Sequence, residues 1–355
     1  MEAEERVAAL TALVAPVDRE AGAEALRRHD RLVKPPGSLG RVEAIGVRLA
    51  AIAGACPPPV PRRPVVVIAA GDHGVLAQGV SPWPSEVTGA MIAAFCSGTA
   101  AVNAIAATVG AGVLVLDVGV ASDLPVHPRL RHARVRPGTA DLSKGPAMSR
   151  AEAAAAVLAG AAAAEDLIAG GADLLVTGDM GIGNSTPAAC LIAAFTGKPA
   201  AEVTGRGTGI DDATLALKTK VVAHAIDLHR PDARDALGVL AAVGGLEHAA
   251  LAGLILAGAA HRIPVVLDGV NAVAAALAAA VLRPEAVAYL LAGHRSVEPG
   301  ASAALDHLGL EPLLDLQMRL GEGTGALLAV PIVVTAAAVL RDMATFEEAG
   351  VPHGA

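Results

Sequence analysis

Glu322 lies between Gly321 and Gly323, in one of three glycine-rich segments that could take part in chemistry. Glycines let the backbone approach a ligand closely, which leaves the carboxylate as the sizeable group that the loop presents. A glutamate has a reference pKa of about 4.3 and becomes a useful base near neutral pH when an apolar surrounding raises that pKa. The apolar residues 326–334 could supply this surrounding. Glu322 is therefore a candidate base, and a solvated loop carboxylate is the alternative.

The other two glycine-rich segments, 178–186 and 205–209, could bind an anion through their backbone N–H groups. The first precedes an apolar helix predicted over 187–195, and a helix N-terminus favours a phosphate. Its glycine order, G-x-x-G-x-G, differs from the dinucleotide fingerprint, and Gly197-Lys198 does not complete a Walker loop, so neither NAD nor ATP is indicated. Lys218 is a candidate charge partner for a phosphate, although a single lysine is more often at the surface.

Short β-branched runs predict strands at 65–68, 113–116, 174–176, 265–267 and 287–291. Alanine- and leucine-rich segments of helical length lie between most of them, at 151–169, 215–228 and 247–260. This alternation predicts an α/β fold with a parallel sheet covered by helices.

Polar residues follow all five predicted strands, as in Asp72-His73 and Asp268-Gly269. Ligands of open α/β sheets bind beyond the carboxyl ends of the strands, so the endings together favour one site. Asp72 and His73 could equally cap an ordinary βα turn. These two residues and His294 could ligate a metal, but their spacing matches no metal motif, and we expect no metal.

Residues 1–60 differ from the rest, because helices are predicted at 2–14, 19–32 and 38–53 before Pro57-Pro58-Pro59. We expect a domain boundary near residue 60. We also expect residues 126–138, which are rich in proline and arginine, to form a surface excursion.

The composition limits the partners and the location of this chain of 355 residues. Mean hydropathy is +0.54, yet the uncharged stretch 87–116 contains several polar residues, and one Trp, one Tyr and three Phe are too few for aromatic belts. The net charge of −8 without a long basic run argues against nucleic acid as a partner. The three cysteines are far apart, and the acidic N-terminal residues do not form a signal peptide. We therefore expect a soluble cytoplasmic protein without a membrane partner.

Seven motifs in order along the chain resemble the nicotinate-nucleotide–dimethylbenzimidazole phosphoribosyltransferase family, which acts in cobalamin lower-ligand synthesis. They are residues 34–41 (KPPGSLGR), 70–75 (AGDHGV), 178–186, 205–212, 294–300 (HRSVEPG), 321–325 (GEGTG) and 343–346 (MATF). Seven ordered matches are far more specific than one glycine loop.

The resemblance implies transfer of the 5-phosphoribosyl group from nicotinate mononucleotide to 5,6-dimethylbenzimidazole, with inversion at the anomeric carbon and without a cofactor. It also implies a homodimer and a three-layer, Rossmann-like large domain beside a smaller helical domain built from the chain ends. The expected parts are an N-terminal helical part over 1–60, the α/β domain over 61–304 and a C-terminal segment over 305–355 that carries Glu322 and completes the small domain.

By the same resemblance, Glu322 is the general base, and Asp179 stands where many family members have Glu. This shorter side chain favours a role in organising the loop over direct contact with substrate. The phosphate and ribose are assigned to Gly181, Gly183, Asn184, Ser185, Gly207 and Lys218. The acceptor base is assigned to Trp83, Ser85, Glu86, Asp72 and His73.

Three alternatives remain open from the sequence. The acceptor could be another base, such as a different benzimidazole, adenine or a phenol. A nucleotide hydrolase would use the same loops with water as the acceptor and would release nicotinate without any added base. An apolar membrane or nucleotide-binding module would show no turnover.

Overall fold

A parallel β-sheet forms the centre of the protein. The computed structural model describes residues 2–352, and within them the sheet has six strands in the order β3-β2-β1-β4-β5-β6. Each neighbouring pair is parallel, so the predicted α/β fold class is confirmed. The strands are β1 (Pro64–Gly71), β2 (Gly112–Gly119), β3 (Leu130–His132), β4 (Leu174–Met180), β5 (Val265–Leu267) and β6 (Leu290–Ala292).

The strand order reverses between β1 and β4. The chain runs outward from β1 through β2 to β3, and then returns to the other side of β1 to form β4. Connections that leave neighbouring strands in opposite directions open a crevice beyond their carboxyl ends, where ligands bind in doubly wound sheets. Ala70 of β1 pairs with Met180 of β4 at this end of the sheet.

Helices cover both faces of the sheet, because alternate strand residues point to opposite sides. In β1, Val67 belongs to the apolar core of one face and Val66 to that of the other. On the first face, α6 (Arg150–Ala169) and α11 (Leu246–Ala260) pack closely, since a Cβ at Gly160 would lie 1.7 Å from the Ala250 carbonyl oxygen. The other helices of this layer are α1 (Ala3–Leu13), α7 (Ser185–Thr196), α8 (Ala200–Val203), α9 (Asp212–His229), α10 (Ala236–Val243), α12 (Val270–Leu282) and α13 (Pro299–Leu308).

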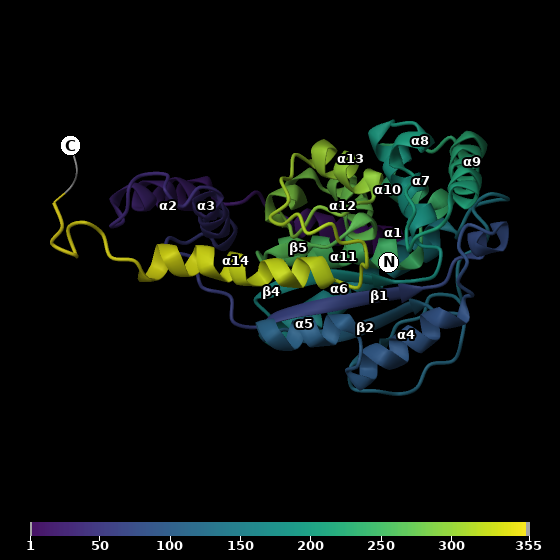
Figure 1. Cartoon of the computed structure of the whole chain (residues 1–355), viewed down its shortest axis with the longest axis horizontal. Coiled ribbons are helices and arrows are strands. Elements are labelled where there is room, and N and C mark those ends of the chain that lie inside the picture. The colour runs from purple at the N-terminus through teal and green to yellow at the C-terminus, as the bar shows by residue number, and fades with distance from the viewer. Residues whose placement is uncertain (1, 353–355) are drawn as a thin grey trace.

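The second face is covered by α4 (Glu86–Ser97), α5 (Ala101–Val109) and the first half of α14 (Thr324–Asp342). Figure 1 shows the sheet between these helices and the layer of α11 and α12. The expected three layers are therefore present.

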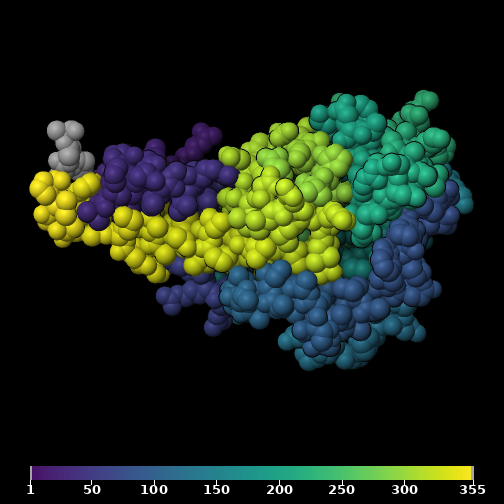
Figure 2. Space-filling model, in the orientation of Figure 1, coloured from purple at the N-terminus to yellow at the C-terminus, as the bar shows by residue number. Residues whose placement is uncertain are grey.

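A smaller helical group projects from this body. It consists of α2 (Arg19–Arg31), α3 (Arg41–Ala53) and the second half of α14, and both Figure 1 and Figure 2 show it at one end of the molecule. Arg28 joins α2 to α14 by donating from Nε to the Leu340 carbonyl oxygen at 2.6 Å. The ends of the chain thus meet, as the small-domain prediction requires.

Two parts of the chain differ from the predicted small domain. The prediction assigned residues 1–60 to it, whereas Val7 and Leu10 of α1 are buried in the core shared with α6 and α11. It also assigned residues 305–355 to it, whereas the first half of α14 packs on the sheet. Helix α14 therefore connects the two bodies, and the domain boundaries stay a proposal.

Two element predictions are wrong in part. The sequence predicts a strand over 287–291, but the 3-10 helix η2 (Pro284–Tyr289) precedes the shorter β6. Proline suits the first position of a helical turn, and Arg48 donates hydrogen bonds to the carbonyls of Val287 and Ala288. The predicted surface excursion over 126–138 contains the edge strand β3, whose polar Arg131 and His132 hide the strand pattern.

Two helical stretches are long and apolar enough to cross a membrane, Glu86–Val109 and Thr324–Asp342. The first is interrupted, because α4 ends at Ser97 and α5 begins at Ala101. The second is α14, of which 56% of the apolar window is buried against the sheet and α3. Core helices of a folded protein have the same character, so the absence of a membrane partner stays a prediction.

Candidate active site

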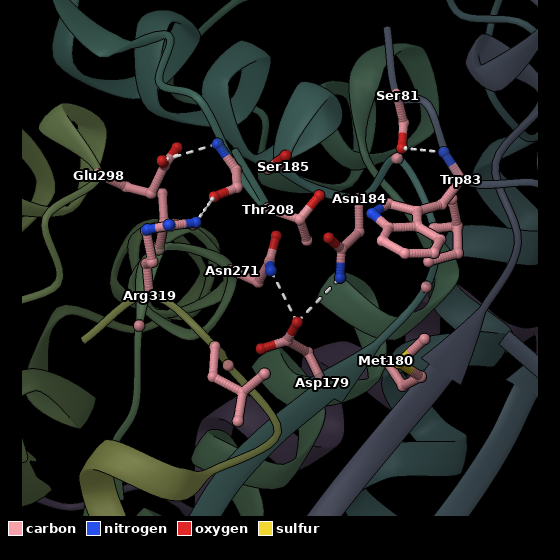
Figure 3. Close-up of a pocket in the computed structure, with 18 of the residues that line it drawn as sticks. Ser81, Trp83, Asp179, Met180, Asn184, Ser185, Thr208, Asn271, Glu298 and Arg319 are labelled. Atoms are coloured by element: carbon pink, nitrogen blue, oxygen red, sulfur yellow. Dashed lines mark hydrogen bonds between the residues drawn. The ribbon is translucent and has the colours of Figure 1, made fainter. Parts of the chain in front are cut away.

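A cavity of about 440 Å³ opens beyond the carboxyl ends of β4, β5 and β6, beside the point where the strand order reverses. Figure 3 shows its polar side chains facing one another from separate segments of the chain. Nine of the predicted site residues line it, namely Trp83, Asp179, Gly181, Gly183, Asn184, Ser185, Gly207, Lys218 and Glu322.

The Glu322 loop has an unusual backbone that the buried Asp268 carboxylate holds in place. Gly321, Glu322 and Gly323 have φ angles of 81°, 64° and 87°, a left-handed conformation that glycine tolerates and glutamate rarely adopts. Asp268, at the end of β5, accepts hydrogen bonds from the N–H groups of Gly323 at 3.0 Å and Ala326 at 2.9 Å. It thereby fixes the start of α14 and the direction of the Glu322 side chain.

A glycine in β4 allows this loop to approach the sheet. A Cβ at Gly178 would lie 2.7 Å from the Glu322 carbonyl oxygen, which is closer than real Cβ contacts. Gly178 therefore explains how Glu322 reaches the crevice instead of remaining in solvent.

Glu322 is 5% exposed, and its Oε2 atom accepts no hydrogen bond from any of residues 2–352. Burial raises its pKa to about 7, and the nearby Asp179 and Asp268 carboxylates contribute to this shift. A carboxylate with this pKa and an unpaired oxygen can accept a proton at neutral pH.

Asp179 faces the same cavity from the end of β4. Its Oδ2 atom accepts hydrogen bonds from Asn184 Nδ2 at 2.8 Å and Asn271 Nδ2 at 2.7 Å, as Figure 3 shows. Its Oδ1 atom is buried without a partner in the part of the chain that the structure describes. Burial raises the pKa of Asp179 to about 7, and the Asp268 carboxylate adds to this effect. Asp179 both organises its loop and presents a free oxygen to the cavity.

The second end of the cavity is built around Lys218. This side chain is 1% exposed, and its Nζ donates to Ser185 Oγ at 2.9 Å and to the Gly205 carbonyl oxygen at 3.0 Å. Burial lowers the pKa of Lys218, while Glu298 opposes that shift. The N-terminus of α7 begins here at Ser185, so a cation and a helix dipole act on the same space.

The Gly207 loop is held by two charged side chains. The Gly207 N–H donates to Glu298 Oε1 at 2.8 Å, and Arg319 donates to the Gly207 carbonyl oxygen at 3.3 Å. Both contacts are drawn in Figure 3. The sequence predicts that the Gly207 N–H binds an anion of the ligand, but this N–H already donates to the Glu298 carboxylate.

One wall of the cavity is apolar. Val87, Met91, Met180 and Ile182 line it, and Trp83 stands at its edge with 52% exposure. A flat heterocycle can be buried against such a surface, with the indole available for stacking.

Four residues predicted to contact the acceptor base lie outside the cavity lining. Ser85 and Glu86 are exposed at the start of α4, and neither belongs to the cavity lining. Asp72 accepts from the Ala121 N–H at 2.8 Å, and it organises the loops that follow β1 and β2. His73 is buried with its Nε2 atom 3.0 Å from Glu247 Oε1, behind Asp179. For Asp72 and His73 the turn-capping or packing alternative fits the geometry better.

Sequence reasoning missed several residues of the lining. Glu298 lines the cavity and lies in the quoted motif 294–300, a signal that went unused. Asp268 does not line the cavity, but it follows a predicted strand, belongs to the endings expected to form one site, and accepts from the Gly323 N–H. Asn271 is the polar residue near the start of the apolar helix α12, and Arg319 lies shortly before the Glu322 loop. Their roles depend on which strands become neighbours, which local pattern does not report.

Comparisons with known proteins place this arrangement in a class. A family model described as "Phosphoribosyltransferase" matches residues 14–351. The chain therefore belongs to a phosphoribosyltransferase family.

Individual relatives are more specific. The chain is 56% identical to the nicotinate-nucleotide–dimethylbenzimidazole phosphoribosyltransferase of Salinispora tropica, over 96% of this chain and 98% of that one. It is 55% identical to the protein of the same name from Chloroflexus aggregans, over 95% and 96%. The crystal structure of the enzyme so named from Thermus thermophilus superposes with a TM-score of 0.91 at 49% identity, covering 95% of this chain and 100% of that chain. The chain belongs to the nicotinate-nucleotide–dimethylbenzimidazole phosphoribosyltransferase family.

Proposed function

We propose that the protein transfers the 5-phosphoribosyl group of nicotinate mononucleotide to 5,6-dimethylbenzimidazole, which yields α-ribazole 5′-phosphate and nicotinate. One observation carries the proposal: a buried carboxylate with an unpaired oxygen, Glu322, shares a cavity with a buried lysine and a helix N-terminus. Glu322 can accept a proton, and Lys218 together with the N-terminus of α7 can bind a phosphate.

In the proposed reaction, Glu322 removes the proton from one ring nitrogen of the benzimidazole. The other nitrogen then forms a bond to the anomeric carbon, while the bond from that carbon to the pyridinium nitrogen of nicotinate breaks. The electron pair of the broken bond neutralises the pyridinium, so the leaving group needs no proton. Attack from the face opposite the leaving group inverts β to α.

Asp179 suits the positive charge that develops on the ribose in this reaction. Its free Oδ1 atom faces the cavity, and a fixed anion beside a developing cation lowers the barrier in a site that excludes water. The carboxylate needs no reorientation, because Asn184 and Asn271 already hold its other oxygen. We assign Asp179 to this electrostatic role.

The 5′-phosphate is assigned to the second end of the cavity, to the residues around the α7 N-terminus and Lys218. These are Gly181, Gly183, Asn184, Ser185 and Lys218, while Gly207 lines the same end of the cavity with its N–H already donating to Glu298. Anchoring the phosphate there leaves the ribose between the two ends and places the reacting carbon near the carboxylates, which is the positioning that a two-substrate transfer requires.

The acceptor base is assigned to the apolar wall of Val87, Met91, Met180 and Ile182, with Trp83 at its edge. Such a wall accepts planar rings by shape and burial rather than by many hydrogen bonds. Which lower-ligand base is preferred remains part of the proposal.

A product assay by mass spectrometry tests the function. The purified protein is incubated with nicotinate mononucleotide and, in separate reactions, dimethylbenzimidazole, benzimidazole, adenine, a phenol or no acceptor. We expect α-ribazole 5′-phosphate with dimethylbenzimidazole and little nicotinate without an acceptor. Equal nicotinate release without an acceptor would identify a hydrolase, and a dominant product with adenine or a phenol would change the acceptor.

We further propose that the chain acts as a homodimer in the cytoplasm. The outer surfaces of α4 and α5 expose alanines without any charged side chain between Val87 and Val109, and a second copy would cover this smooth surface. Light scattering after size exclusion in detergent-free buffer should give twice the 35.1 kDa mass of one chain. A monomer at micromolar concentration would contradict the proposal.

A further inference from the structure

A chain of buried polar side chains leads away from the cavity behind Asp179. Asn271 donates from Nδ2 to Asp179 Oδ2 at 2.7 Å, and its Oδ1 atom lies 3.2 Å from Nε2 of His248. The other ring nitrogen of His248, Nδ1, lies 2.8 Å from Oε1 of Glu247. Glu247 and His248 are 0% exposed. Neither residue touches the cavity, so the reaction described above does not use them directly.

The orientation of the Asn271 amide determines which atoms of this chain carry protons. Asp179 Oδ2 already accepts two N–H donors, from Asn184 and Asn271, so this oxygen has no room for a proton of its own. The same orientation turns the amide oxygen of Asn271 toward His248 Nε2, which must then carry hydrogen. Nδ1 lies 2.8 Å from a Glu247 carboxylate oxygen without making a regular hydrogen bond, and an anion at this distance favours a positive charge on the ring. The ion-pair distance and the contact to Asn271 together favour a doubly protonated His248.

A neutral His248 would reverse the chain. It would keep its proton on Nδ1, facing Glu247, and its bare Nε2 would attract the amide N–H₂ of Asn271. The amide oxygen would then face Asp179 Oδ2, and two acceptors could stay together only if Asp179 held a proton. The charge on His248 and the ionisation of Asp179 are thus linked through one amide group.

We propose that His248 is a positioning residue that, acting through Asn271, keeps Asp179 ionised and oriented toward the cavity. The inference rests on the proposed function, because it gives Asp179 the anionic form assigned above. The positive charge of His248 would compensate the negative charge of Asp179, a buried carboxylate that lies near the carboxylates of Asp268 and Glu322.

The charged surroundings of His248 agree with this assignment. Burial disfavours the charged ring, but Glu247 on its own helix and Asp179 on β4 outweigh burial, so the pKa of His248 is raised. Burial also opposes ionisation of Glu247, but His73 and His248 lower its pKa well below the usual range. The His73 ring, which follows β1, stands 6.3 Å from the His248 ring, centroid to centroid. On the far side of Asp179, Asp268 and Glu322 add negative charge.

Nuclear magnetic resonance of the ¹⁵N-histidine-labelled protein tests the charge without any reference to turnover. The His248 signals are identified by their loss in His248→Leu. At about pH 7 both ring nitrogens of His248 should carry hydrogen. A neutral ring with hydrogen on Nδ1 alone would overturn the proposal, whatever reaction the protein catalyses.

Kinetics of a double-mutant cycle tests the consequence for Asp179. His248→Leu should lower kcat, change KM little, and move the low-pH limb of kcat to higher pH by about one unit, because Asp179 loses a nearby opposite charge. In a protein that already carries Asp179→Asn, His248→Leu should leave the pH dependence of kcat unchanged. His73→Leu is the matched control: it removes the other imidazole beside Glu247 but leaves the contact to Asn271, so the limb should stay in place.

A structural role would give a different pattern. His248→Leu would then lower kcat by the same factor in the wild-type background and in the Asp179→Asn background, without moving the limb, and this result would overturn the proposal. If the leucine variant does not fold, His248→Gln retains an N–H donor toward Asn271 without the charge. This variant should keep KM close to the wild-type value and move the low-pH limb of kcat to higher pH, and a limb at the wild-type position would contradict the role of the charge.

Discussion

The two ends of the cavity bury charge in opposite ways. At one end, Lys218 gives hydrogen bonds to Ser185 and to the Gly205 carbonyl, and its charge lies beside Glu298. At the other end, Glu322 and Asp179 each keep an oxygen without a partner among residues 2–352, and both carboxylates have pKa values raised to about 7.

The difference separates binding from chemistry. A buried charge with satisfied hydrogen bonds is fixed in position and can attract a ligand without changing its protonation. The free oxygen of the buried Glu322 carboxylate is poised to gain a proton, which is what a general base does, whereas Asp179 is assigned the role of a fixed anion beside the ribose. The folded chain therefore divides its cavity into a positioning end and a reacting end.

Among the substitutions, Glu322→Gln at the reacting end should lower kcat the most. Loss of a general base typically lowers turnover ~100- to 10,000-fold, while the amide keeps the size of the side chain. We expect kcat with dimethylbenzimidazole to fall by this factor and the Kd of nicotinate mononucleotide, from calorimetry, to stay nearly constant. A kcat close to that of the wild type would remove the proposed role of Glu322.

The positioning end is tested by Lys218→Ala. A hydrogen bond to a charged group contributes about 1.5–3 kcal/mol, which corresponds to a loss of about 10- to 150-fold in affinity for the phosphorylated substrate. Nicotinate riboside, which lacks the phosphate, is the control ligand and should lose little. Equal losses for both ligands would show that Lys218 supports the fold of the loop rather than the phosphate.

The support beneath the reacting end is tested by Asp268→Asn. Asp268 accepts from the N–H groups of Gly323 and Ala326 and lies 3.3 Å from His294. An amide can accept on one side only, so the free energy of unfolding should fall by about 1–3 kcal/mol in a denaturant titration. Stability equal to that of the wild type would mean that the Glu322 loop holds its conformation without this carboxylate.

The smallest effect is expected at the apolar wall, from Trp83→Ala. An aromatic contact at the edge of a site contributes about 0.5–1.5 kcal/mol, so KM for the acceptor should rise about 2- to 13-fold. KM for the mononucleotide should hardly change, and Trp83→Phe should retain most of the contact. A larger effect on the mononucleotide than on the acceptor would place Trp83 on the wrong substrate.

The fold and the reacting end could be predicted from the sequence because their signals are local. Buried strands show as β-branched runs, and the loop around Glu322 shows as alternating glycines. The assignments of Asp72, His73, Ser85 and Glu86 to the acceptor base came from the family resemblance and, for Asp72 and His73, from their place after a predicted strand. Neither signal determines on which side of the crevice a side chain lies. Asp72 instead accepts a hydrogen bond from the Ala121 N–H, and His73 lies 3.0 Å from the buried Glu247 carboxylate.

Residues that act across the sheet had weaker signals. Asn271 meets Asp179 only because β5 becomes the neighbour of β4, and the two residues are 92 positions apart in the chain. The pairing of edge strand β3 with β2 and the packing of α1 against α6 and α11 depend in the same way on contacts between segments that are distant in the sequence. Topology, and not local pattern, decides these pairings.

The pH dependence of kcat at saturating substrates tests the central claim most directly, because the carboxylate base must be ionised to act. Since the pKa of Glu322 is raised to about 7, the unprotonated fraction and the rate should both rise as the pH increases through about 7. Glu322→Gln is measured in parallel, and it retains any titration that belongs to the acceptor. We predict that the wild-type rate rises steeply between about pH 6 and about pH 8 and that the residual rate of the variant rises less steeply, because only Asp179, with its pKa raised to about 7, still titrates there. The same rise in both proteins would contradict the account.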